Sequence, residues 1–206
     1  MTTVNTMVSG ASSMMSSVLR IMTSGILAGA LIKTGAAEKI AETIVEKLGE
    51  KRAILAIAIA TMIICTVGVF IDISVITVAP IAMAIGRKAG LTNSSILLAM
   101  IGGGKAGNIL SPNPNTIAAS ASTTAGTTIA SQTFGATLIA QGVPALSAGA
   151  MVHAGATVLD SLPHGSFFHA TGGSVKMSIN ERMKLIPYEA LVGLTSTILA
   201  VIWYLI

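Results

Sequence analysis

A long apolar run constrains this chain more than any other feature of its sequence. Ala53–Gly86 contains a single charged residue, Asp72. A soluble domain has about 25% charged residues, whereas this chain has 10%, with 52% hydrophobic residues and a mean hydropathy of +0.82. One crossing of a bilayer needs about 20 residues, so the run predicts two short crossings, or one crossing followed by a broken helix. Gly68, Asp72 and Pro80 mark the expected break.

The remaining composition also predicts an all-α, polytopic membrane protein. Aromatic residues make up only 3% of the chain, whereas small residues are frequent, and small residues allow membrane helices to pack closely. Gly25 and Gly29 would give the predicted span Met14–Ile32 such a face. The net charge of +4 does not indicate a nucleic-acid partner, because the basic residues lie in short clusters with few aromatics. They indicate the cytoplasmic side instead, and Cys65, the only cysteine, is expected to be a small buried residue.

Several other elements follow from their local patterns. In residues 34–52, Ile40, Ile44 and Leu48 recur every four residues among Glu and Lys, which predicts an amphipathic surface helix that ends at Gly49. A helix capped by Thr92-Asn93-Ser94 should lead into a triple glycine, residues 176–184 should form a charged loop or a short surface helix, and Tyr188–Ile206 should be the last span.

A polar stretch, Gly102–Thr116, interrupts the apolar segments. It holds four glycines, two prolines, three asparagines and one lysine, which predicts irregular backbone rather than a regular helix. Irregular backbone within a membrane is tolerated only where it is buried in protein or lines a wet cavity. The stretch is therefore a candidate substrate or ion site, with an ordinary extramembrane loop as the alternative. Asp160–Gly165 is a second broken polar motif with the same two interpretations.

The polar side chains of the first stretch are candidates for binding a small anion. A lysine ammonium attracts carboxylates, although Lys105 could instead extend to the membrane interface. Amides and hydroxyls bind the oxygens of a hydroxy acid without carrying a fixed charge. The candidate substrate-binding residues here are Lys105, Asn108, Ser111, Asn113, Asn115 and Thr116.

Six segments carry a resemblance to a known family. Five of them are similar to its first half and one to a motif late in its second half: Thr34–Ala41, Gly49–Arg52, Val69–Asp72, Ala84–Gly90 and Pro112–Thr116, followed by Leu159–Gly165. They resemble the gluconate permeases, which are gluconate–proton symporters. The resemblance implies proton-coupled uptake of a small organic anion such as gluconate by a multi-pass protein of the bacterial inner membrane. It also implies inverted repeats, re-entrant hairpins and often a dimer.

On the basis of these motifs, Ser161 and His164 join the substrate-binding candidates, and Asp72, Asp160 and His164 are candidates for carrying the coupled proton. A carboxylate within an apolar run is a functional candidate by default. The alternative for Asp72 is a helix-end cap or an interfacial residue at the hairpin turn. The spacing of the histidines matches no metal-binding pattern. We therefore expect no metal, no cofactor and no enzymatic activity.

The chain departs from the resembled family in its length. Members are roughly twice as long, as paired repeats require. The sequence therefore predicts one membrane domain over residues 1–206, in which 1–120 resembles a first-half repeat and 121–206 the end of a second-half repeat. The low-complexity stretch Ala118–Thr124 looks like the join. We expect an internal deletion near residues 117–122 and a missing span before Met1, and a non-transporting membrane fragment or assembly partner is the alternative function.

Overall fold

The computed structural model describes residues 29–110, 134–156 and 161–205, together with residue 158 and a few positions between 15 and 27. Every regular element within these ranges is a helix, which confirms the all-α prediction. The described positions between 15 and 33 are helical. A Cβ added at Gly25 or Gly29 would have no heavy atom of the described residues within 4 Å, so the close-packing face predicted for these two glycines stays a prediction.

Helix α2 (Ala36–Leu48) is the amphipathic helix that the sequence predicts. Its inner face is formed by Ala37 and Ala41, each 1% exposed, so small side chains bring it close to the bundle. Gly49 ends it with a positive φ of 75°, a conformation that glycine adopts without strain. The short 3-10 helix η1 (Glu50–Arg52) then leads into the apolar run.

The apolar run folds into two antiparallel helices, α3 (Ala53–Thr66) and α4 (Ile71–Lys88). The break falls at Gly68, whose φ is +111°, as predicted. Pro80, however, lies inside α4 and does not end it. It is exposed, whereas Val78 and Ala79 are fully buried, so packing holds the helix together although one backbone donor is missing.

Helix α5 (Asn93–Leu110) begins at the predicted cap, where the backbone N–H of Ser95 donates to Thr92 Oγ1 at 3.2 Å. It then continues through all four glycines of the first polar stretch. The prediction of irregular backbone is therefore wrong for residues 102–110, and residues 111–116 lie outside the described residues. The physical reason is a close contact with α3, in which glycine is required for space rather than for flexibility.

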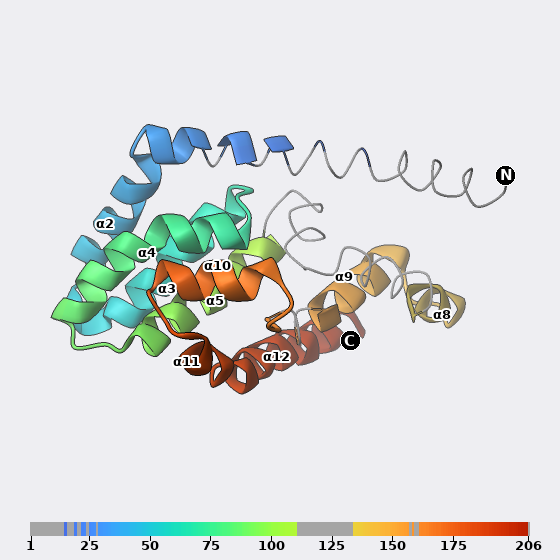
Figure 1. The fold of residues 1–206 in the computed structure, drawn as a ribbon. Helices are drawn as coiled ribbons and strands as arrows, with labels where there is room; N and C mark the ends of the chain where they lie inside the picture. Colours follow the sequence, from blue (N-terminus) through green and yellow to red (C-terminus); the bar gives the residue numbers. More distant parts are fainter. Residues whose placement is uncertain are drawn as a thin grey trace, which may run out of the picture.

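The second half contributes five further helices: α8 (Ala136–Ala140), α9 (Ala145–Ala156), α10 (Ser166–Ser174), α11 (Ile179–Met183) and α12 (Ile186–Leu205). Helix α10 packs against α4, and Asn93 Nδ2 donates to the Val175 carbonyl at 3.1 Å. Helix α12 pairs with α9, where Thr197 Oγ1 donates to the Ala154 carbonyl at 3.0 Å. Figure 1 shows α10 lying along the bundle of α3, α4 and α5, with α12 below it.

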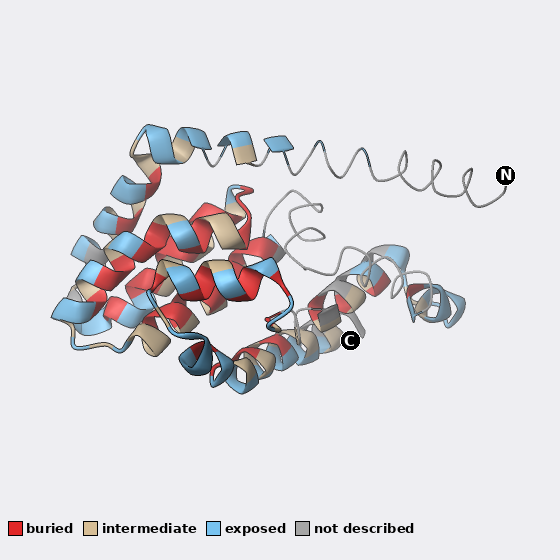
Figure 2. Cartoon of the chain, in the orientation of Figure 1, coloured by how far each residue is buried: buried red, intermediate tan, exposed pale blue. Residues whose placement is uncertain are grey.

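The buried residues concentrate in the bundle of α3, α4, α5 and α10 (Figure 2). Ile64, Val75, Leu97 and Phe167 form part of one apolar cluster. Helix α8, by contrast, contains no buried residue. None of the helices that the structure describes combines the length and the hydropathy needed to cross a membrane.

Helix α11 lies within residues 176–184, where a short helix was one of the two predictions, and it begins with a capping box. Ser178 Oγ and its backbone N–H both donate to Glu181 Oε2, at 2.8 and 3.0 Å, and these hydrogen bonds lower the pKa of Glu181. A folded-state pKa below the unfolded value of about 4.3 stabilises the helix above that pH. The contribution is lost as the pH falls through the folded-state pKa.

We therefore expect Ser178→Ala to raise the pKa of Glu181 part of the way to its ordinary value, because the backbone N–H still donates. An NMR titration of the Glu181 carboxyl carbon in both proteins measures this. An identical pKa in the two would show that the hydroxyl contributes nothing.

Candidate functional site

Lys105 and Asn108 are buried polar residues on the last turns of α5, and each is only 4% exposed. The alternative of a lysine that extends to the interface does not hold, because the side chain stays inside the bundle. Burying an ammonium is favourable only where oxygens or a counter-charge surround it. Asn108 Oδ1 accepts no hydrogen bond within the described structure. Such an atom costs about 1–3 kcal/mol, so Asn108 Oδ1 stays a candidate acceptor for a ligand.

The glycines around Lys105 set its position by bringing α5 into contact with α3. Gly103 and Gly107 are one turn apart on the face that meets α3. A Cβ at Gly103 would collide with the Ala58 carbonyl and lie 2.8 Å from the Ala58 Cα. A Cβ at Gly107 would collide with the Met62 carbonyl and lie 2.7 Å from the Cβ of Cys65. This is the close backbone approach that small residues at a four-residue spacing permit.

The break between α3 and α4 lies beside this part of α5. A Cβ at Gly104 would lie 2.5 Å from Ile71 Cγ1 and 3.6 Å from Cys65 Sγ. Asp72 is half-buried in the first turn of α4, where a carboxylate interacts favourably with the helix dipole. It follows the N-cap residue, Phe70, so it is a first-turn residue and not the cap. Ser74, two residues further on, is fully buried.

The second polar motif joins α10 at the same end of the bundle. Ser161 is 3% exposed, whereas His164 lies exposed in the turn that precedes α10. His169 Nε2 bonds the Pro163 carbonyl at 2.8 Å and stabilises this turn. Helix α10 runs alongside α4 in the same direction (Figure 1), so the turn lies toward the first turns of α4. The break, the end of α5 and the second motif therefore share one end.

Comparison with known proteins establishes the family. The sequence model of the GntP permease family matches residues 1–183 of this chain. The chain belongs to the GntP permease family. An uncharacterized transporter of Haemophilus influenzae is 34% identical over 363 aligned residues, which cover 96% of this chain and 87% of the relative. No solved structure matches. The resemblance to gluconate permeases predicted from the motifs is thus confirmed, and the chain is of the transporter class.

The alignment with the Haemophilus transporter also bears on the length of this GntP permease. It spans 363 positions, whereas the chain has 206 residues, so it must contain long gaps on the side of this chain. Such gaps are expected from an internal deletion. Its position near residues 117–122, and the division into repeats at residue 120, stay predictions.

The structure brings together part of the site predicted for this permease. Lys105 and Asn108 lie on α5, Asp72 lies at the adjacent break, and Ser161 and His164 precede α10. The other five candidates lie outside the described residues: Ser111, Asn113, Asn115, Thr116 and Asp160. Their roles stay predictions.

Sequence reasoning missed a buried ion pair, and it placed Arg182 in a charged surface segment. Arg182 and Glu189 are each 1% exposed, and both guanidinium Nη atoms contact the two carboxylate oxygens. Arg182 also donates to the Phe168 carbonyl and to Thr171 Oγ1, at 3.4 and 3.3 Å. The seven-residue spacing of the two charges was the available signal. The pair joins α10, α11 and α12, and every charge in it is satisfied, so it has a structural role.

Proposed function

We propose that this GntP permease carries a small organic anion, such as gluconate, together with protons across the bacterial inner membrane. The observation that supports this most is the buried pair Lys105 and Asn108. It lies on the last turns of α5, beside the break between α3 and α4. A buried cation three residues before a buried amide oxygen without a hydrogen bond suits a hydroxy acid, whose carboxylate needs positive charge and whose hydroxyls need acceptors.

Each residue has a distinct part in this proposal. Lys105 attracts the carboxylate of the substrate, and Asn108 Oδ1 accepts from one of its hydroxyls. Ser111, Asn113, Asn115 and Thr116 extend the site along the chain after α5, and Ser161 and His164 face it from the second motif. Asp72, Asp160 or His164 binds the coupled proton, because each can change its charge during the cycle.

The outer surface of the second half supports a membrane location. Helix α12 has large apolar side chains that are about half exposed: Leu191, Leu194, Ile198, Leu199 and Ile202. A soluble monomer rarely exposes a continuous apolar face of this kind. The multi-pass topology and a homodimer remain part of the proposal.

A non-transporting fragment or assembly partner is the second candidate, and the long alignment gaps favour it. A chain that lacks much of a paired-repeat protein keeps its packing surfaces but not necessarily a closed site. The two candidates differ in one measurable property, which is uptake of substrate by the purified chain on its own.

Lys105→Gln tests the proposed site. We expect kcat/KM for gluconate uptake by proteoliposomes to fall by at least about tenfold, because a charge-assisted contact contributes about 1.5–3 kcal/mol. Lys47→Gln, at an exposed lysine of α2, is the matched control and should keep the original rate. Equal uptake rates for the two variants would show that Lys105 does not bind the substrate. No uptake by the unmodified chain would favour the second candidate function, a non-transporting fragment.

A further inference from the structure

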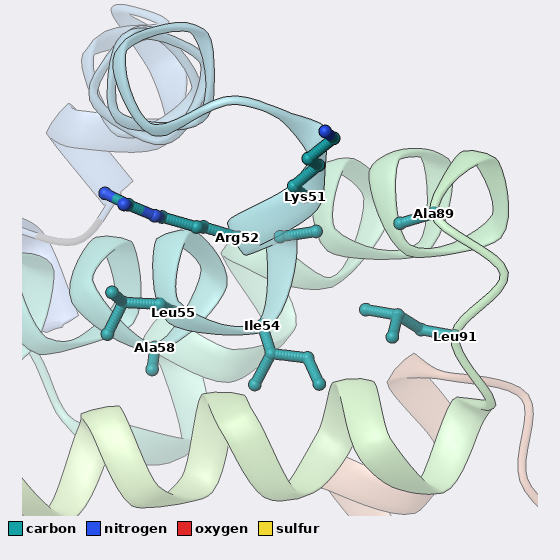
Figure 3. A pocket seen from close by; sticks show the side chains of 8 residues that line it. Lys51, Arg52, Ile54, Leu55, Ala58, Ala89 and Leu91 are labelled. Atoms are coloured by element: carbon teal, nitrogen blue, oxygen red, sulfur yellow. The ribbon is translucent and has the colours of Figure 1, made fainter.

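A cavity of about 610 Å³ lies at the end of the bundle where α3 begins (Figure 3). It is formed by η1, by the first turns of α3 and by the link between α4 and α5. Its lining residues are Lys51, Arg52, Ala53, Ile54, Leu55, Ala58, Ala89 and Leu91. The proposed transport site does not use this cavity, which therefore needs a different explanation.

The lining of the cavity combines a basic edge with an apolar wall. Lys51 and Arg52 are exposed, and no acidic residue is among the lining residues whose side chains the structure describes. Below them, Ile54 and Leu55 are 48% and 50% exposed, although both are large apolar side chains. In Figure 3, Lys51 and Arg52 lie along the upper edge, and the Arg52 side chain extends over Leu55. A ligand that fits must carry negative charge at one end and hydrocarbon at the other.

A second basic pair adds to the positive charge at this end. Arg87 and Lys88 are exposed in the last turn of α4, directly before the lining residue Ala89. The antiparallel pairing of α3 and α4 brings this pair to the same end as Lys51 and Arg52. Both ends of the apolar hairpin therefore lie at one end of the described bundle.

We propose that this cavity binds an anionic phospholipid. Lys51 and Arg52 hold the phosphate, and the upper part of one acyl chain lies along Ile54, Leu55 and Ala58. Ile54 and Ala58 are one helical turn apart, about 6 Å along the axis, which suits the first few methylene groups of an acyl chain. Basic pockets between helices on the cytoplasmic side of membrane proteins bind anionic headgroups in this way. Free phosphate would leave the apolar wall without a partner.

The test is lipid binding by the full chain in a neutral detergent, with the substrate absent. Phosphatidylglycerol is the probe, phosphatidylcholine tests the need for net negative charge, and glycerol phosphate tests the headgroup without acyl chains. Native mass spectrometry counts bound lipid, and thermal unfolding measures stabilisation. The variants are Lys51→Gln with Arg52→Gln, and Lys33→Gln with Lys39→Gln as a control of equal charge at exposed residues, of which Lys39 lies beside Ile63, toward the opposite end of α3.

We expect saturable binding of phosphatidylglycerol to the original chain and to the 33/39 control. Affinity should fall by roughly tenfold or more in the 51/52 variant, since each surface cation contributes to anionic lipid binding. Ile54→Gln keeps both cations and should also weaken binding of the lipid. Circular dichroism checks that each variant folds. Equal affinity of the 51/52 variant and its control, or equal binding of phosphatidylcholine or glycerol phosphate, would overturn the proposal. These outcomes do not depend on transport activity.

Discussion

Gly103→Ala is expected to lower the free energy of unfolding by about 1–3 kcal/mol or more, the range found for overpacked sites. The added Cβ would collide with the backbone carbonyl of Ala58, and its nearest other neighbours are also backbone atoms of Ala58, the carbonyl carbon at 2.7 Å and the Cα at 2.8 Å. Backbone cannot move aside as a flexible side chain can. The two helices must therefore separate, which also displaces Lys105 two residues further along α5.

Gly102→Ala is the matched control, one residue away on the same helix. A Cβ there would meet no heavy atom within 4 Å, so the change should be neutral or should stabilise α5 by up to about 1 kcal/mol. Thermal or denaturant unfolding in detergent micelles compares the two variants. If Gly103→Ala is as stable as Gly102→Ala, the close contact between α3 and α5 is not present in the folded protein.

Arg182→Ala is expected to destabilise the chain by about 3–5 kcal/mol, the typical cost of removing one partner of a buried ion pair. Glu189 would lose its cation partner at 1% exposure, and Thr171 would lose a donor. The Arg182 guanidinium also lies 4.9 Å from the centre of the Phe168 ring, so packing between α10 and α11 is lost with it. We expect the midpoint of thermal unfolding to fall by roughly 10 °C, by the usual scaling.

Two further variants separate the ion pair from a general effect of lost charge. Lys184→Ala removes a cation from an exposed position two residues away and should change the midpoint little. The double variant Arg182→Met with Glu189→Leu removes both charges and should recover much of the stability, because no unpaired charge stays buried. A double variant as unstable as Arg182→Ala would contradict this explanation.

Local sequence patterns predicted where the helices form better than they predicted how the helices pack against one another. The four-residue recurrence of Ile40, Ile44 and Leu48 predicted α2. Gly49 predicted the end of that helix and Gly68 a break, and both glycines have a positive φ. These are effects of nearest neighbours in the sequence. Pro80 and the glycines of α5 predicted helix breaks, but α4 and α5 continue through them. Packing against helices far away in sequence stabilises these positions, and a local pattern does not contain that information.

The candidate site could be predicted from the sequence only in part. Lys105 and Asn108 are candidates from the sequence because they are polar residues in an apolar chain. Their burial depends on the close contact between α5 and α3 that Gly103 and Gly107 permit. The buried pair of Arg182 and Glu189 is a tertiary feature, since a charge in a polar segment normally faces solvent. The burial of both pairs of residues depends on helices that are distant in sequence.

The central claim is that this GntP permease moves a gluconate-like anion with protons. The most direct measurement is the uptake of labelled gluconate by proteoliposomes that contain the purified chain, with a pH gradient that is acid outside. We predict accumulation against the substrate gradient that stops when a protonophore collapses the pH gradient, and that is much reduced in Lys105→Gln. Uptake at the same rate with and without the pH gradient would contradict proton coupling, and no uptake under either condition would contradict transport by this chain.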